Sequence, residues 1–216
     1  MLKSLVIETS AEINASVIWL HGLGADGHDF APIVDELGIA NLRFILPHAP
    51  VRPVSINNGH AMPAWYDIYG LNHDSQQDES GIRETEANIV ALIAHELSQG
   101  IPAQRIVLAG FSQGGAMALH TAIRYPHRLA GILALSTYLP LKSFLLADRN
   151  IANLDVPIFM AHGEFDNVIT LATSQASKAA LESAGYVINW HEYAMGHSVC
   201  AEEISDIRDF LTRILA

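Results

Sequence analysis

Residues 105–125, RIVLAGFSQGGAMALHTAIRY, contain the stretch that decides the fold. Ile106–Ala109 is a short apolar run that predicts a buried strand, and an apolar helical pattern follows from Gly115 to Tyr125. Between them, Gly110–Gly114 fits the motif G-x-S-x-G. A strand that turns sharply into a helix brings two backbones close together, so the flanking positions need glycine and Ser112 stands at the apex. In this setting the motif predicts that Ser112 is a hydrolase nucleophile rather than a solvated turn serine.

The rest of the chain alternates between short apolar runs and helical patterns. We predict strands at residues 5–7, 16–20, 42–46, 106–109, 129–135, 156–161 and 186–193. We predict helices at residues 29–37, 82–100, 115–125 and 170–184, and a last helix that ends near residue 214. This alternation implies an α/β fold with a mostly parallel central sheet and helices on both faces. Residues 50–81 are expected to be irregular, because prolines and an Asn-Asn-Gly turn interrupt them.

The composition limits the class of protein. The chain has 216 residues, 50% of them hydrophobic, and a net charge of -11, which disfavours binding to nucleic acid. We expect a single domain, residues 1–216, without room for a separate cap domain. No apolar segment approaches the roughly 18 residues that span a bilayer, so we expect no stable membrane insertion. The single cysteine, and an N-terminal apolar run too short for a signal peptide, predict a cytoplasmic location.

A glycine-rich loop, His21–Gly27, follows the second predicted strand and contains G-x-G-x-x-G. One interpretation is a dinucleotide-binding loop, which requires an acidic residue at the end of the next strand to bind the ribose hydroxyls. No acid follows that strand before Asp67. The other interpretation is an oxyanion loop, in which the backbone amides of Leu23 and Gln113 stabilise negative charge beside Ser112. The missing acid favours the oxyanion loop.

The partners of Ser112 are predicted from the order of the chain. In a parallel α/β sheet the functional loops lie at the carboxyl ends of the strands, and serine hydrolases built on such sheets carry the acid before the histidine. His197 comes just after the last predicted strand, whereas His191 lies within it. The loop after the preceding strand offers Glu164 and Asp166. Asp166 lies further into that loop, so we predict Asp166 as the acid, Glu164 as the reserve and His197 as the general base.

Five segments together resemble the acyl-protein thioesterase and small carboxylesterase family of α/β-hydrolases, over essentially the whole chain. They are HGLGADG (21–27), MPAWYDI (62–68), DSQQDESGI (74–82), GFSQGG (110–115) and GHS (196–198). The resemblance implies hydrolysis of carboxyl esters or acyl thioesters through an acyl-enzyme, without a metal or a cofactor. It also implies the triad Ser112, Asp166 and His197. The oxyanion donors that it implies are Leu23 and Gln113.

Three further residues are predicted to bind substrate. Leu71 and Val168 match positions that line the acyl channel of the family. Trp65 is the third, although burial as a core aromatic is an equal interpretation. Thr170 stands where many relatives have proline after the acid loop, and threonine suits that position because it is a good helix N-cap. Family members often pair, which leaves a homodimer open.

Other functions were weighed against this interpretation. No H-E-x-x-H zinc motif occurs, although the chain has 11 histidines. Cys200 follows His197 closely, and we expect it to be a small buried hydrophobic residue rather than a catalytic thiol. The alternatives for the whole chain are a lysophospholipase and a catalytically inactive hydrolase fold that only binds. An intact triad argues against the second.

Overall fold

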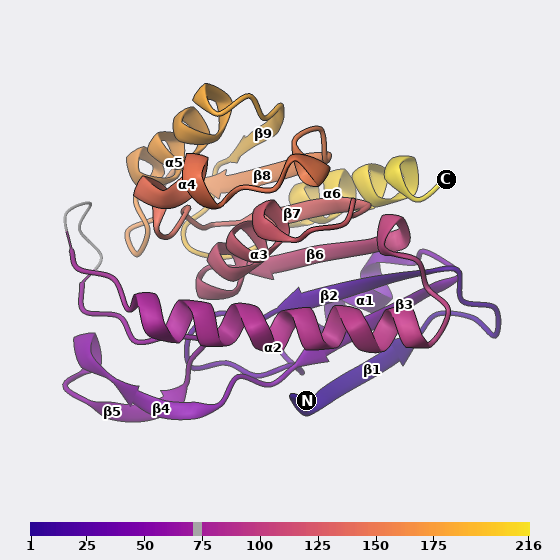
Figure 1. Ribbon diagram of the computed structural model, residues 1–216, viewed down its shortest axis with the longest axis horizontal. Coiled ribbons are helices and arrows are strands. Elements are labelled where there is room, and N and C mark those ends of the chain that lie inside the picture. Colours follow the sequence, from indigo (N-terminus) through magenta and orange to yellow (C-terminus); the bar gives the residue numbers. More distant parts are fainter. Residues whose placement is uncertain (71–74) are drawn as a thin grey trace.

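The computed structural model describes residues 1–70 and 75–216, and the predicted substrate contact Leu71 lies outside them. Figure 1 shows a central sheet with helices packed around it. The strands are β1 (Ser4–Glu8), β2 (Ala15–Leu20), β3 (Leu42–Pro47), β4 (Val51–Val54), β5 (His60–Pro63), β6 (Ile106–Phe111), β7 (Gly131–Leu135), β8 (Ile158–Gly163) and β9 (Ile188–Tyr193). The helices are α1 (Ala31–Leu37), α2 (Glu79–Ser98), α3 (Gln113–Arg124), α4 (Leu145–Asp148), α5 (Leu171–Ser183) and α6 (Ala201–Ile214).

The central sheet has the strand order β1-β3-β2-β6-β7-β8-β9. Strand β1 runs antiparallel to β3, and the other neighbouring pairs are parallel. Strands β2, β7 and β8 are buried along their whole length, as expected when helices cover both faces of a parallel sheet. The predicted α/β class is therefore confirmed. The parallel order also brings the carboxyl ends of β2, β6, β8 and β9 to one edge, where the predicted functional loops begin.

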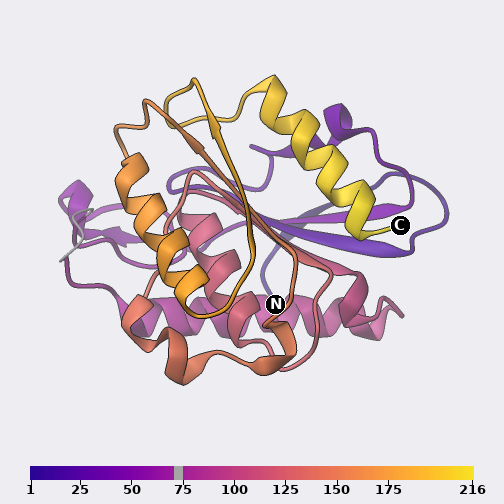
Figure 2. The same ribbon diagram turned by 90° about the horizontal axis from the view of Figure 1, so that it is seen from above.

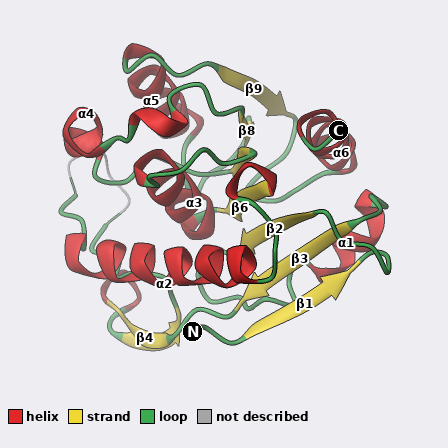
Figure 3. Ribbon diagram, turned by 45° about the vertical axis from the view of Figure 1, so that its right-hand side comes forward, coloured by secondary structure: helices red, strands yellow, loops and turns green. Residues whose placement is uncertain are grey.

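Two apolar cores lie on opposite faces of the sheet. On one face, α2, α3 and α5 contribute buried residues such as Ile89, Met117 and Leu181. On the other face, α1 and α6 contribute Val34 and Phe210. Figure 2 shows α6 across the sheet from α2 and α3, and Figure 3 shows the same separation from a third direction. Helix α3, which follows Ser112, is thus enclosed between the sheet and α2, and this burial holds its N-terminus in place.

Residues 50–81 differ from the expectation of an irregular stretch, because they contain a hairpin of β4 and β5. Its turn is built from Asn58 and Gly59, whose φ angles of 55° and 75° are left-handed. The prolines that suggested irregular structure, Pro53 and Pro63, lie in the hairpin itself. A two-stranded hairpin leaves the outer edge of each strand unpaired, so it tolerates residues without an N–H group. The prediction of irregular structure here was wrong for this reason.

Two of the long helices, α2 and α5, begin at side-chain caps. The Asp78 carboxylate accepts a hydrogen bond from the Gly81 amide at 2.9 Å, so α2 begins at Glu79, earlier than predicted. Thr170 is the N-cap of α5, and its hydroxyl accepts from the Thr173 amide, as expected. None of the helices in the described part of the chain is long and apolar enough to cross a membrane.

Candidate active site

Ser112 lies at the turn between β6 and α3, with φ 54° and ψ -121°. This conformation is strained for a residue that has a Cβ atom, and the surrounding structure must hold it. A Cβ on Gly110 would lie 2.3 Å from the backbone of Gly114, and one on Gly114 would lie 2.2 Å from a backbone oxygen of β2. Strand β7 and the segment after it hold the turn, because the Ser112 amide donates to a β7 carbonyl at 2.9 Å and Thr137 Oγ1 donates to the Ser112 carbonyl at 2.6 Å. The turn therefore presents the Ser112 hydroxyl at the N-terminus of α3.

His197 connects Ser112 to Asp166. Its Nε2 atom lies 2.9 Å from Ser112 Oγ, and its Nδ1 atom lies 2.6 Å from Asp166 Oδ2. Because a carboxylate only accepts hydrogen bonds, Nδ1 carries the proton and Nε2 presents its lone pair to the serine hydroxyl. Phe111 packs against the imidazole, with 4.8 Å between the ring centres. This geometry suits a base that takes a proton from Ser112 during nucleophilic attack.

Asp166 is buried in the loop that follows β8. Its Oδ1 atom accepts from the amides of Val168 and Ile169, both at 2.9 Å, which leaves Oδ2 directed at His197. The reserve acid, Glu164, is exposed, and its backbone amide donates to the Tyr193 carbonyl at the end of β9. The structure thus brings Asp166, and not Glu164, to the histidine.

A second histidine holds the same loop and was given no role by the sequence analysis. His162, at the end of β8, is fully buried, and its Nε2 atom lies 2.7 Å from the Ile169 carbonyl oxygen and 3.3 Å from Asp166 Oδ2. A carbonyl oxygen only accepts, so Nε2 carries the proton. Burial lowers the pKa of His162 and keeps it neutral. The sequence signal was a histidine at the carboxyl end of the strand before the acid loop.

The loop His21–Gly27 runs past Ser112 and is held by its own first side chain. The buried imidazole of His21 donates from Nδ1 to the Gly22 carbonyl at 2.7 Å and accepts at Nε2 from the Ala49 amide at 3.0 Å. Burial lowers the pKa of His21, which favours the neutral tautomer that this pair of contacts needs. Among the described residues, the Leu23 amide has no acceptor. A donor without a partner beside the Ser112 hydroxyl is suited to an oxyanion.

The contacts of Gln113 bear on two predictions, namely its own backbone amide as an oxyanion donor and Trp65 as a substrate contact. As the first residue of α3, its amide has no acceptor within the helix. Its side chain accepts from the Trp65 amide at 2.9 Å and donates to the Tyr66 carbonyl at 2.7 Å. The Trp65 side chain is fully buried and donates from Nε1 to the His21 carbonyl at 2.8 Å, so it cannot touch a substrate. Trp65 instead anchors the loop that carries Leu23, and its prediction as a substrate contact is wrong.

A cavity of about 340 Å³ opens beside Ser112. Its lining includes the two predicted oxyanion donors, Leu23 and Gln113, and the imidazole of His197. Its apolar walls come from Ile56 at the tip of the hairpin, Ile68, Phe111, Tyr138, Ile169 and the predicted substrate contact Val168. A cavity of this size and character suits a small apolar group bound against Ser112. The hairpin's contribution was not foreseen, because the hairpin itself was not.

Cys200 lies at the N-cap of α6 and is half-buried, so the expectation of full burial was only partly correct. Its Sγ atom lies 3.7 Å from a carboxylate oxygen of Glu202. The atoms that His197 contacts are those of Ser112 and Asp166 instead. The Cys200 thiol therefore takes no part in the hydrogen bonds that link Ser112, His197 and Asp166.

Comparison with known proteins finds relatives over nearly the whole chain. The sequence profile of the Phospholipase/Carboxylesterase family matches residues 2–215. The chain is 41% identical to acyl-protein thioesterase 1 of Neurospora crassa over 223 residues, which cover 98% of this chain and 91% of that protein. Its fold is similar to that of Zea mays acyl-protein thioesterase 2, with a TM-score of 0.91, 28% identity and full coverage of both chains. Arabidopsis thaliana SOBER1 gives a TM-score of 0.90 at 31% identity, over 94% of this chain and 99% of that one.

Proposed function

This chain belongs to the phospholipase/carboxylesterase family of α/β-hydrolases and is a hydrolase of the ester and thioester kind, and we propose that Ser112 is its nucleophile. The observation that carries this assignment is the series of hydrogen bonds from Ser112 through His197 to Asp166, at 2.9 and 2.6 Å. The series ends at the wall of a cavity, so a bound acyl group could reach the serine oxygen.

The proposed reaction uses only side chains and backbone amides of this chain. Ser112 Oγ attacks the acyl carbonyl carbon while its proton passes to His197 Nε2, and Asp166 stabilises the imidazolium that forms. The carbonyl oxygen becomes an oxyanion beside the amides of Leu23 and Gln113, and one such donor contributes about 3 kcal/mol where it has been measured. His197 then protonates the departing alcohol or thiol, and water releases the acyl group by the same steps in reverse roles.

The substrate class follows from the relatives and from the cavity. The relatives named above include acyl-protein thioesterases, so we propose acyl thioesters of proteins, together with carboxyl esters, as substrates. Val168 and Ile56 would contact the acyl chain, since they line the cavity beside the nucleophile. Leu71 remains a predicted contact. Each methylene buried against such walls contributes up to about 0.8 kcal/mol.

The organisation of the chain belongs to the same proposal. Residues 1–216 are proposed to form one domain, supported by the packing of α6 against α1, which joins the C-terminal helix to the N-terminal half of the sheet. The single cysteine fits a reducing compartment, so we place the enzyme in the cytoplasm. The family resemblance supports a homodimer, which light scattering on the purified protein would test.

A fluorophosphonate probe tests the nucleophile directly. We expect one covalent adduct, located on Ser112 by mass spectrometry, and complete loss of hydrolysis. Ser112→Ala should keep its circular dichroism spectrum and lose about 10⁴-fold or more of the rate. Ser198→Ala is the matched control, because Ser198 is exposed beside His197 and should remain active and labelled. An adduct on Ser136 or Ser198 would refute the assignment.

A further inference from the structure

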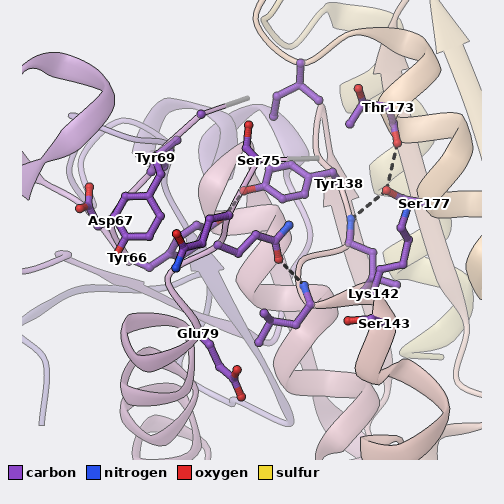
Figure 4. A pocket seen from close by; sticks show the side chains of 17 residues that line it. Tyr66, Asp67, Tyr69, Ser75, Glu79, Tyr138, Lys142, Ser143, Thr173 and Ser177 are labelled. Carbon is purple, nitrogen blue, oxygen red and sulfur yellow. Dashed lines mark hydrogen bonds between the residues drawn. The ribbon is translucent and has the colours of Figure 1, made fainter. Parts of the chain in front are cut away.

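A second cavity of about 360 Å³ lies next to the one that contains Ser112. Figure 4 shows the side chains that line it. The two cavities share four lining residues, namely Tyr66, Ile68, Tyr138 and Ile169. These four residues therefore form the wall between a chamber that holds the nucleophile and a chamber that does not.

The two tyrosines of this wall are joined by their hydroxyl groups, 2.7 Å apart. Tyr66 is buried and Tyr138 is nearly so, and burial raises the pKa of both phenols. Among the described residues, neither hydroxyl has another hydrogen-bond partner. Separating the rings would thus leave two buried hydroxyls unpaired, which opposes opening of the wall.

Hydrogen bonds hold both tyrosines at fixed positions relative to the turn that carries Ser112. The Tyr66 carbonyl accepts from the side chain of Gln113, the residue that follows Ser112. Tyr138 follows Thr137, whose hydroxyl donates to the Ser112 carbonyl. The wall therefore stands at a set distance from the serine oxygen, and the depth of the first chamber is set by the same contacts that hold the turn.

The second chamber differs from the first in chemistry. Its lining includes polar side chains that the first chamber lacks, among them Gln76, Gln77, Ser143, Thr173 and Ser177. Two of these hold backbone amides of the opposite wall, since Gln77 Oε1 accepts from Leu141 and Ser177 Oγ accepts from Leu139. An alkyl chain that entered this chamber would cover these polar groups, although Leu139 and Leu141 also line it.

We propose that the hydrogen-bonded pair Tyr66–Tyr138 is a specificity determinant that limits the length of the acyl chain. With the pair closed, the acyl group is confined to the chamber at Ser112, and catalytic efficiency rises with chain length until that chamber is full. Longer chains must part the two rings to enter the second chamber, whose lining is more polar than that of the first. This inference rests on the proposed function, because it assumes that the acyl group binds beside Ser112.

The test is kcat/KM for p-nitrophenyl esters from acetyl to palmitoyl, measured on the wild type and on variants of the pair. Tyr138→Ala joins the two chambers, and we expect the ratio of dodecanoyl to butyryl efficiency to rise about tenfold or more. Tyr138→Phe keeps the ring but removes the hydrogen bond, and we expect a smaller rise of a few fold. Tyr69→Ala is the control, because Tyr69 lines only the second chamber and should leave the wild-type ratio unchanged.

A double variant separates the proposal from simple loosening of the site. Ser143 also lines only the second chamber, so Ser143→Trp should fill it and cancel the gain of Tyr138→Ala for long chains while leaving butyryl hydrolysis alone. The proposal is overturned if Tyr138→Ala and Tyr138→Phe change all chain lengths by one factor, or if the wild type already prefers palmitoyl esters. Failure of the proposed function looks different, because hydrolysis would then survive Ser112→Ala at every chain length.

Discussion

The Nε2 atom of His162 lies 3.3 Å from Asp166 Oδ2, the same oxygen that His197 Nδ1 reaches at 2.6 Å. The buried acid is therefore flanked by two histidines with different tasks. His197 is partly exposed and faces Ser112, whereas His162 is fully buried and donates to the Ile169 carbonyl. The first is placed to exchange a proton, and the second is placed to hold the acid loop.

His162→Leu should weaken the support of the acid loop while leaving the proton exchange by His197 possible. The Ile169 carbonyl would lose its donor while remaining buried, so we expect the free energy of unfolding to fall by about 1–3 kcal/mol. Chemical denaturation would measure this, with the exposed His95→Leu as the control. Hydrolysis should persist at a reduced rate, and loss as complete as that of Ser112→Ala would contradict a supporting role.

Asp166→Asn tests the acid against its reserve. An asparagine can offer its amide group to Nδ1 and favour the wrong tautomer of His197, so we expect kcat to fall about 10⁴-fold without unfolding. Glu164→Gln should stay within about twofold of the wild type, because the Glu164 carboxylate is exposed and away from the histidine. Equal losses in the two variants would show that the acid has been assigned wrongly.

Gly110→Ala tests the close packing of the turn that carries Ser112. The added Cβ would lie 2.3 Å from the Gly114 backbone, which cannot move without displacing α3. We expect the free energy of unfolding to fall by about 3 kcal/mol or more. Gly196→Ala is the matched control, because its nearest neighbour would be 3.9 Å away, and its melting temperature should stay close to that of the wild type. Similar melting temperatures for the two variants would contradict the close packing at the turn.

Glu203 makes stability depend on pH. Its side chain is fully buried in α6, and burial raises its pKa to about 8. Because an unfolded glutamate titrates near about pH 4.3, the folded state binds the extra proton between these values. Stability from this group is complete below about pH 4 and is lost as the pH rises toward 8, by about 1.4 kcal/mol per unit at most.

Glu203→Gln should remove this dependence, since glutamine stays neutral. Urea denaturation at pH 5 and pH 8 should show the wild type losing several kcal/mol relative to the variant as the pH rises. Parallel changes in the two proteins would mean that Glu203 is not protonated in the folded state at pH 5 to 8.

The loop His21–Gly27 should not bind a dinucleotide, although it contains G-x-G-x-x-G. After β3, the position nearest this loop is occupied by His48, whose Nδ1 accepts from the Gly27 amide at 3.0 Å. A carboxylate for the ribose hydroxyls is missing from that place. Calorimetry with NAD and NADP at millimolar concentration should detect no heat of binding, and a micromolar dissociation constant would reverse this interpretation.

Much of the fold could be predicted because its signals are local. Buried strands appear in the sequence as short apolar runs and helices as longer periodic patterns. The order of the strands and helices could therefore be predicted without knowledge of their packing. Gly110 is needed because a Cβ there would meet the backbone of Gly114, which lies only four residues along the chain. Asp166 and His197 could be proposed because carboxyl ends of parallel strands meet at one edge, whatever the details of the side chains.

Only the tertiary structure decided what lies around these three residues. The hydroxyls of Tyr66 and Tyr138 meet across 72 positions of sequence, and the Trp65 indole meets the His21 carbonyl across 44. Such contacts depend on how loops from different strands converge, and no local periodicity encodes that convergence. The sequence alone therefore determined the order of the chemical groups, whereas the packing of distant loops determined which aromatic side chain is buried and where the chamber at Ser112 ends.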